Sequence, residues 1–308
     1  MQLFASDLWL MEPNYLRQFE AMAAATFKAA AGGQRTPRVE QSRAKNVGLI
    51  RVHGAIETRP TELGQLLGMP SYEAIGQQFD AMMSDDSVSS IIFDVASPGG
   101  MVYGAMELAE KVFQSRGKKP TLAVANPVAA SGAYWLASAA ERLIVTPSGD
   151  VGSVGVISEH VDISAMLERL GEKVTVIRSS KSPYKAESAS VQPLSEEGMA
   201  NLQARADAIY NQFVGDLARF RGVTVDYVND NFGKGRVVDA KSAMKVGMVD
   251  RIDTFDGIVG KVLSGRLRLG STAANDEWDA PTSRELRKSV ARRVSEVATN
   301  VAVMASEE

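Results

Sequence analysis

One serine in the sequence lies between a predicted strand and a predicted helix. The apolar run 121–125 predicts a buried strand, and residues 134–140 predict a helix that begins shortly after Ser131. A hydroxyl at a helix N-terminus lies beside free backbone N–H groups and the positive end of the helix dipole, which suits a nucleophile in acyl transfer. Serine is also favoured as a simple helix N-cap. The local sequence leaves both interpretations open.

Two glycine-rich turns lie near this junction in the chain. Residues 98–100 (Pro-Gly-Gly) separate a predicted strand from the helix 102–113, and glycine allows positive φ and close approach of a substrate backbone. A tight turn without a ligand is an equally good interpretation. The second turn, residues 147–156, has neither the Gly-Lys-Ser/Thr sequence of a P-loop nor the spacing of a dinucleotide fingerprint.

Composition excludes several kinds of site. The 308 residues include no cysteine, so thiol nucleophiles and thiolate metal sites are excluded. With two histidines a multi-histidine zinc site is not expected, and a Ser-His-Asp triad has only His53 and His160 as candidates. We expect His53 to be a partly buried residue at a strand end. A net charge of −3 gives no indication of nucleic-acid binding.

The predicted elements alternate between strands and helices, which indicates an α/β fold with a largely parallel sheet. Right-handed crossovers then place the strand-end loops on one side. The expected strands are 47–54, 88–95, 121–125, 142–146, 173–177 and 247–253. The expected helices are 72–83, 102–113, 134–140, 163–170, 194–222, 241–246 and 255–264. Residues 55–70 are expected to be a loop, and 178–188 a polar loop that carries Lys181 and Lys185.

The termini are expected to lie outside this core. Residues 1–31 have helical spacing, 32–45 are expected to be a linker, 270–283 are polar, and 284–304 predict a helix. The first residues lack a basic, long apolar leader, and no apolar run reaches about 18 residues, so we expect a cytoplasmic protein without a signal peptide or membrane span.

Five stretches, in this order and spacing, resemble the signal peptide peptidase A family of serine peptidases, over roughly residues 45–262. They are Ser97–Gly100, Ala130–Trp135, Gly152–Val156, Tyr184–Glu187, and Gly235–Val237 with Ala243 and Gly247–Asp250. The short form with an N-terminal arm most resembles phage-encoded capsid-assembly or head-maturation proteases.

The resemblance implies a ClpP/crotonase-like fold of repeated ββα and βα units with N- and C-terminal helical arms. Its division of the chain would be an arm and linker over residues 1–45, a peptidase domain over 46–265, and a flexible segment with a C-terminal helix over 266–308.

The resemblance also implies roles for particular residues. Ser131 would be the nucleophile, Lys185 its general base, and Ser153 the serine that helps to hold the lysine. The backbone N–H groups of Gly100 and Gly132 would form the oxyanion hole. Ala133 stands where many members have a second glycine, and Lys181 is the alternative base. The Lys-Ala-Glu context favours Lys185.

The chemistry is consistent on its own terms. A serine needs a base to take its proton, and burial can lower the pKa of a lysine by several units, so that its neutral amine can act as that base. The expected activity is peptide-bond hydrolysis without cofactor or metal. The expected partners are protein or peptide substrates, further copies of the chain in a homo-oligomer, and phage scaffold, portal or capsid proteins. The expected location is the bacterial host cytoplasm or the procapsid.

Two alternatives belong to other classes. One is a non-catalytic assembly partner whose terminal helices bind a portal, scaffold or capsid protein, and the other is a crotonase-type acyl-CoA enzyme on the same fold. A fluorophosphonate reaction at Ser131 would exclude the first, and CoA-thioester binding would favour the second.

Overall fold

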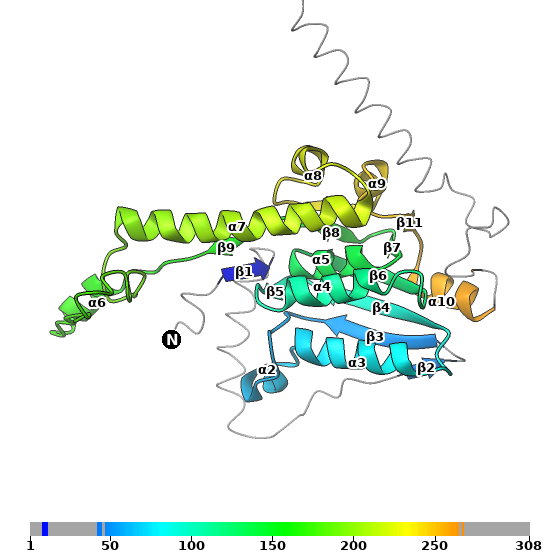
Figure 1. Ribbon diagram of the computed structural model, residues 1–308, viewed down its shortest axis with the longest axis horizontal. Helices are drawn as coiled ribbons and strands as arrows, with labels where there is room; N and C mark the ends of the chain where they lie inside the picture. The colour runs from blue at the N-terminus through cyan, green and yellow to red at the C-terminus, as the bar shows by residue number, and fades with distance from the viewer. Residues whose placement is uncertain (1–7, 12–41, 45–46, 265–266, 268–308) are drawn as a thin grey trace, which may run out of the picture.

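The computed structural model describes residues 8–11, 42–44, 47–264 and 267 of the chain. In this part an eight-stranded sheet forms the centre of the molecule, in the order β10-β8-β6-β4-β3-β2, with β7 beside β6 and β11 beside β7 (Figure 1). The strands are β2 (Ser42–Ala44), β3 (Val47–His53), β4 (Ser90–Ser97), β6 (Thr121–Ala130), β7 (Arg142–Val145), β8 (Asp150–Gly152), β10 (Val237–Asp239) and β11 (Arg251–Ile252).

The sheet is mainly parallel, as the strand–helix alternation predicted. Strands β3, β4, β6, β7 and β8 run parallel to their neighbours along the sheet, whereas the short β2 and β10 are antiparallel. β6 is longer than expected: its first half pairs with β7 and its last three residues pair with β8. This mixed α/β fold is consistent with the predicted ClpP/crotonase-like class.

A second sheet has three strands in the order β5 (Gly99–Met101), β1 (Leu8–Met11) and β9 (Ile157–Ser158). β1 is antiparallel to both neighbours. The prediction of a helix over residues 1–31 is therefore wrong for residues 8–11, because those residues find two strand edges to pair with. The remainder of that helix lies outside the described residues. Residues 42–44, expected in a linker, form β2 instead.

The described helices are α2 (Glu62–Leu67), α3 (Tyr72–Ser84), α4 (Ala105–Gln114), α5 (Gly132–Ala139), α6 (Ser164–Arg169), α7 (Glu196–Arg221), α8 (Val225–Asn231), α9 (Ala240–Lys245) and α10 (Phe255–Leu263). All but α2 and α8 correspond to predicted helices. The expected loop over 55–70 is wrong where α2 lies. The signal for α2 was its cap, since the Thr61 hydroxyl accepts a hydrogen bond from the Gly64 amide at 2.8 Å.

Apolar side chains cover both faces of the sheet. Alternate residues of β4 point to opposite sides: Phe93 joins the larger core under α3, α4, α5 and α7, and Ile92 joins a smaller cluster with Ile258 of α10. A parallel sheet buried on both faces explains the continuous apolar runs of its strands.

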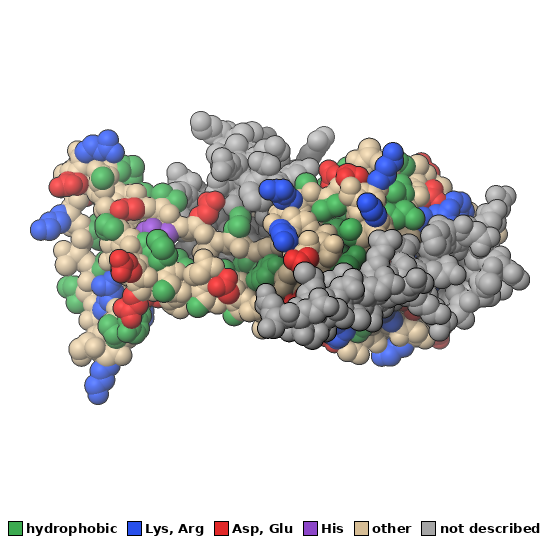
Figure 2. Space-filling view, turned by 90° about the horizontal axis from the view of Figure 1, so that it is seen from above, with side chains coloured by type: hydrophobic (Ala, Val, Ile, Leu, Met, Phe, Trp, Pro, Cys, Tyr) green, Lys and Arg blue, Asp and Glu red, His purple; other side chains and the backbone are tan. Residues whose placement is uncertain are grey.

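One region projects from this core. Residues 159–195, which we call the arm, contain α6 and lie at the end of α7 that is remote from the sheet (Figure 1). No residue between 155 and 197 is buried. The strand predicted over 173–177 is wrong: this stretch has no regular secondary structure and pairs with no described strand. Figure 2 shows hydrophobic side chains interspersed with charged ones on this projecting end.

Among the described helices, none combines the length and the apolar character needed to cross a membrane. The predicted polar segment 270–283 and helix 284–304 lie outside the described residues. The proposed domain boundaries at residues 45 and 265 stay predictions.

Candidate active site

Ser131 lies at the junction of β6 and α5 and is almost fully buried, with 1% of its surface exposed. Its amide donates to the Gly152 carbonyl at 2.6 Å. Its hydroxyl donates to the Gly155 carbonyl at 3.4 Å, a long and therefore weak contact. Because β6 continues to Ala130, the sheet holds Ser131 directly rather than through a flexible loop.

Ser131 is the N-cap residue of α5, but its side chain makes no capping hydrogen bond. Six other described helices do have an N-cap side chain that accepts from the first turn: Thr61, Ser71, Ser195, Thr224, Asp239 and Thr254. The contrast argues against the simple N-cap interpretation of Ser131. Its hydroxyl is therefore available for a role other than capping the helix.

The backbone at Ser131 is strained, with φ at 52°. Only four described residues other than glycine have positive φ: Ser131, Ser153, Ala186 and Lys234. Two of these are predicted site residues, and a third directly follows Lys185. Such strain costs on the order of 1–3 kcal/mol per residue and gathers at functional sites. This signal is not readable from the sequence.

The helix that begins after Ser131 is fixed on several sides. All eight residues of α5 are buried. Trp135 stacks on Phe213 of α7 with ring centroids 4.5 Å apart, and its indole donates to Asp216 at 3.0 Å. At the other end, the Arg116 guanidinium donates to the carbonyls of Ser138, Ala139 and Ala140 at 2.6–2.9 Å. These carbonyls lack helical partners, so the arginine caps the helix.

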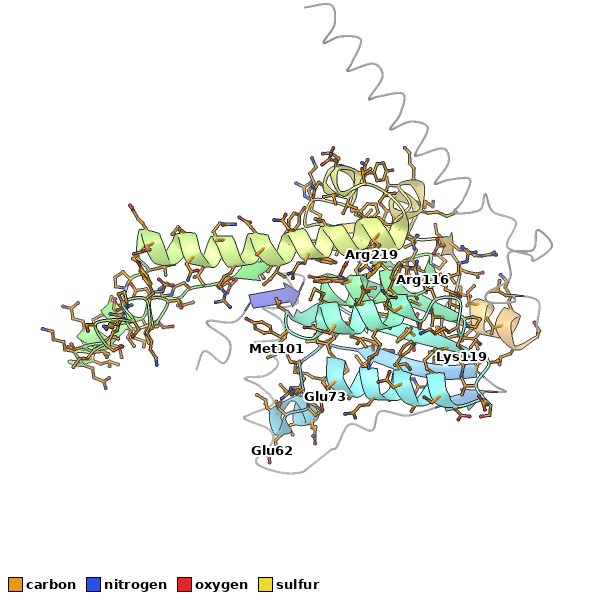
Figure 3. All side chains as sticks on the ribbon, in the orientation of Figure 1. Glu62, Glu73, Met101, Arg116, Lys119 and Arg219 are labelled. Carbon is orange, nitrogen blue, oxygen red and sulfur yellow. The ribbon has the colours of Figure 1, made fainter. Side chains whose placement is uncertain are left out.

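Arg116 also ties α5 to α7 through a donation to the Phe220 carbonyl at 3.1 Å. Its guanidinium lies over the Phe113 ring, 4.5 Å from the centroid, and Arg219 lies over the same ring at 4.8 Å. Figure 3 shows both arginines between α4 and α7. The position of α5 is thus set by α4, α7 and the sheet.

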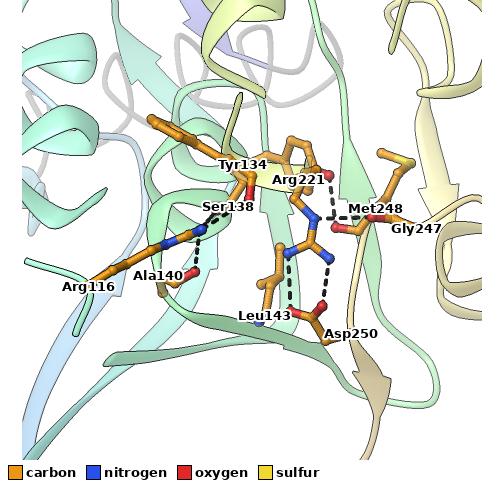
Figure 4. Close-up of polar contacts among 10 residues, drawn as sticks. Arg116, Tyr134, Ser138, Ala140, Leu143, Arg221, Gly247, Met248 and Asp250 are labelled. Carbon is orange, nitrogen blue, oxygen red and sulfur yellow. Dashed lines mark hydrogen bonds and ion pairs between the residues drawn. The ribbon is translucent and has the colours of Figure 1, made fainter. Parts of the chain in front are cut away.

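A buried ion pair lies behind α5 (Figure 4). Arg221 donates two hydrogen bonds to Asp250 at 2.9 and 3.1 Å, and both side chains are almost completely buried. Asp250 also accepts from the Leu143 amide at 2.8 Å. Burial disfavours the charged carboxylate, but Arg221 and these hydrogen bonds hold the pKa of Asp250 below its usual value. Nearby, the Tyr134 hydroxyl donates to the Met248 carbonyl, and burial raises the pKa of that tyrosine.

The two predicted oxyanion glycines lie on neighbouring elements. Gly132 is the first residue of α5, where amides have no helical acceptor. Gly100 lies in β5, which begins two residues after Ser97, the partner of Ala129 in β6. A side chain at Gly100 would place its Cβ 1.9 Å from the Ile56 carbonyl oxygen. The close approach of that backbone requires glycine at position 100.

Ser153 is buried and follows Gly152, whose carbonyl accepts from Ser131. The Ser153 amide donates to the Arg236 carbonyl at 2.9 Å. Its hydroxyl makes no hydrogen bond within the described part of the chain. The structure therefore places Ser131, Ser153, Gly100 and Gly132 around one end of the parallel sheet.

Lys185 does not join this group within one chain. It lies exposed in the arm, where Arg178 donates to its carbonyl. The neighbouring Glu187 accepts from Asn201 in the first part of α7, whereas α5 contacts α7 at Phe213. Twelve residues of helix separate these two contacts, about 18 Å at the usual rise. Lys181 lies in the same exposed loop.

Neither histidine is placed as a partner of Ser131. His53 is half-exposed at the end of β3, two strands away from β6, and its Nε2 contacts Asp94 Oδ2 at 3.0 Å. Asp94 also accepts from Asn126 at 3.1 Å. His160 lies in the arm, just after β9, and neither ring nitrogen has a hydrogen-bond partner among the described residues. A Ser-His-Asp triad around Ser131 does not form.

Comparison with known proteins agrees with the architecture. Residues 114–265 match the model for peptidase family S49. The chain is 31% identical over 267 residues to the head-tail preconnector protein GP5 of Enterobacteria phage P21, covering 85% of this chain and 52% of that protein. It is 30% identical over 233 residues to the capsid assembly protease C of Escherichia phage lambda, covering 76% of this chain and 52% of that protein.

A cellular relative extends the similarity. The putative signal peptide peptidase SppA of Enterococcus faecium is 28% identical over 176 residues, covering 57% of this chain and 50% of that protein. The mixed α/β fold, with its mainly parallel sheet, is consistent with this family. The chain belongs to peptidase family S49, which confirms the resemblance seen in the sequence. It spans about half the length of these curated relatives.

Proposed function

We propose that the chain is a serine endopeptidase with Ser131 as its nucleophile. The observation that carries this proposal is the state of Ser131 itself: buried, strained, and at the N-terminus of α5 without capping it. The serine lies among amides that have no helical partner, and these are suited to hold an oxyanion. Among the described helices, α5 alone begins at a buried serine that has positive φ and makes no capping hydrogen bond.

The reaction follows from this placement. The Ser131 hydroxyl loses its proton to a base and bonds to the carbonyl carbon of the substrate, while the Gly100 and Gly132 amides stabilise the negative oxygen. The C–N bond then breaks as the base returns the proton to the leaving amine. Water attacks the acyl-enzyme by the same route and releases the carboxylic acid.

The proposed base is Lys185, and we assign it to a neighbouring copy of the chain. In one chain the loop of Lys185 packs about 18 Å along α7 from the contact of α5, and Ser131 is only about one helical turn from that contact. The base must be a neutral amine, which removal from water favours. Docking of the arm onto another copy would both bury the amine and bring it to a serine.

The surface of the arm supports a homo-oligomer. Five large apolar side chains of the arm are exposed to solvent: Met166, Leu170, Val174, Ile177 and Tyr184. Several large apolar side chains exposed on one projecting segment favour an interaction site. Ser153, beside the nucleophile and with a free hydroxyl, is the proposed acceptor that holds the incoming lysine.

Mixing two inactive variants tests this assignment. Ser131→Ala and Lys185→Ala should each be inactive alone, whereas co-refolded equal amounts should regain about a quarter of the wild-type sites, because each active site takes its serine and lysine from different copies. Peptide hydrolysis and fluorophosphonate labelling are the readouts. No recovery on mixing would contradict the arrangement between copies, and full activity of Ser131→Ala would end the peptidase proposal.

Lys181→Ala is the matched control for the base. It removes a lysine from the same loop, four residues away, and should leave hydrolysis nearly unchanged. If Lys181→Ala abolished hydrolysis while Lys185→Ala retained it, the base would be Lys181.

The proposed substrates are proteins of phage capsid assembly. The lambda relative is named a capsid assembly protease and the P21 relative a head-tail preconnector protein. Scaffold, portal and capsid proteins are thus the candidates, in the host cytoplasm or within the procapsid. Co-expression with each candidate, followed by mass spectrometry of the products, should show fragments that disappear with Ser131→Ala.

A further inference from the structure

The N-terminal strand β1 lies where the proposed reaction needs its substrate. β1 is the central strand of the small sheet, between β5 and β9, and it pairs antiparallel with both. Among the described strands, β9 pairs with no other strand. Without β1, the facing edges of β5 and β9 would present unpaired backbone groups, the kind of edge that takes up an extended peptide.

Both edges lie beside Ser131. β5 begins two residues after Ser97, which pairs with Ala129 two residues before the serine. β9 begins two residues after Gly155, whose carbonyl accepts the Ser131 hydroxyl. A strand that joins β5 to β9 therefore passes next to the nucleophile.

The pairing also reaches the proposed oxyanion hole. Ile56 donates to the Gly99 carbonyl at 2.9 Å, and Met101 donates to the Ile56 carbonyl at 2.8 Å. Since backbone groups alternate in direction along a strand, the N–H and C=O of Gly100 point to the other edge, toward β1. The register places Gly100 directly opposite Leu10. The Gly100 amide is thus directed at the backbone of Leu10.

The same alternation directs the neighbouring residue of β1 to the other side. Trp9 lies opposite Ile157 of β9, so its backbone groups face β9 while those of Leu10 face β5. Four residues at the N-terminal end of the chain thus make the two-sided backbone pairing that an extended substrate would make. This arrangement differs from an ordinary edge strand, which is paired on one side only.

We propose that Leu8–Met11 is a built-in competitor that occupies the peptide-binding strand position between β5 and β9 and restrains the peptidase until a substrate or assembly displaces it. The proposal rests on the peptidase function proposed above. It assigns to the N-terminal segment a role in regulating the peptidase.

Proline substitution in β1 tests the proposal. Leu10→Pro removes the N–H that faces Gly100, and Trp9→Pro removes the N–H that faces Ile157; each should weaken the closed state by about fivefold, the value of one hydrogen bond. Arg43→Pro is the matched control, because it removes an N–H from β2, another short N-terminal strand, on the large sheet beside β3.

The first readout is independent of catalysis. In a Ser131→Ala background, amide hydrogen exchange should accelerate at Gly100 in Leu10→Pro and remain as in the parent protein in Arg43→Pro. The Met101 amide is an internal control, since the Ile56 carbonyl holds it in either state. Unchanged exchange at Gly100 in both Leu10→Pro and Trp9→Pro would show that β1 does not fill this position.

The second readout is the rate of fluorophosphonate labelling at Ser131. We expect about a fivefold increase in Leu10→Pro and Trp9→Pro over the wild type, and no increase in Arg43→Pro. Faster Gly100 exchange with an unchanged or slower labelling rate would overturn the restraint. Absence of labelling in the wild type and every variant would instead mark failure of the peptidase proposal, and the exchange result would still decide what occupies the strand position.

Discussion

The chain holds its two proposed catalytic side chains in regions of opposite character. Ser131 precedes a helix whose residues are all buried and whose two ends are tied to the sheet, α4 and α7. Lys185 lies in the arm, in which no residue is buried and the loop is held mainly by Arg178 and Gln192. The first region is packed on all sides within one chain, whereas the second contains no buried residue to fix its position.

The helix α7 shows the same difference within a single element. Toward its C-terminus it buries Phe213, Leu217 and Phe220 against the core. Toward its N-terminus Gly198 alone is buried, and Met199 is exposed. A helix of 26 residues whose first half lacks a core is typical of a stem that reaches another molecule.

The largest effects should come from the two proposed catalytic side chains, one in each region. Ser131→Ala and Lys185→Ala should each lower peptide hydrolysis by at least about 10⁴-fold, because either change removes a group that acts as one unit with the other. Neither should shift the thermal unfolding midpoint appreciably, since Ser131 makes one long side-chain contact and Lys185 is exposed. A large fall in the midpoint for Lys185→Ala would contradict the description of the arm.

The next largest effect should be on the free energy of unfolding, and it should distinguish the buried core from the exposed surface. Asp250→Asn leaves Arg221 as an unpaired buried charge and should lower the free energy of unfolding by about 3–5 kcal/mol in urea titrations. The control is Lys234→Gln, which removes an exposed pair with Asp230 at 3.4 Å and should change it by less than about 1 kcal/mol. If both variants lost a similarly small free energy of unfolding, the Arg221–Asp250 pair would not be what stabilises the core.

The same aspartate predicts a pH dependence. Its pKa is lowered in the folded state, so its contribution to stability is present above the unfolded pKa of about 3.9 and is lost as the pH falls through the folded value. Unfolding free energies measured from pH 6 to pH 3 should therefore fall less steeply for Asp250→Asn than for the wild type. Parallel curves would show that the pKa of Asp250 is not lowered in the folded protein.

A smaller effect concerns the boundary between the core and the small sheet. Gly100→Ala would force its Cβ into the Ile56 carbonyl and should cost about 1–3 kcal/mol of unfolding free energy. Because β5 must move, hydrolysis should fall as well. Gly117→Ala is the control, since no atom lies within 4 Å of the position of its Cβ, although its positive φ carries some strain. Equal losses would show that the contact with the Ile56 carbonyl adds nothing to the cost of the substitution at Gly100.

The sequence was informative about the core and much less so about the arm. The alternation of apolar strands and amphipathic helices was sufficient to place Ser131 at a strand–helix junction, because core elements are selected for burial. The spacing of motifs assigned Lys185 but not its distance from Ser131. That distance depends on α7, whose apolar side predicts a helix without indicating how far the helix projects.

The incorrect predictions share a physical cause. Residues 173–177 have the composition of a strand, but a strand forms only where another edge is available, and no described strand pairs with them. Residues 8–11 fall within the helix predicted over 1–31, yet pairing with the edges of β5 and β9 makes them a strand. In both cases the partner, rather than the local sequence, decides the structure.

The smallest effect on the single chain should come from the arm. Ile177, 90% exposed, contributes little to folding, so Ile177→Ser should change the free energy of unfolding by less than about 0.5 kcal/mol. If the arm docks on another copy, the same change should weaken self-association in sedimentation experiments and lower hydrolysis with it. Val225→Ser, at an exposed apolar residue of α8, should leave both unchanged. Weakened self-association with full hydrolysis would contradict the proposed role of the arm. If the arm supplies Lys185 to a neighbouring copy, loss of its interface must also remove the base from the active site.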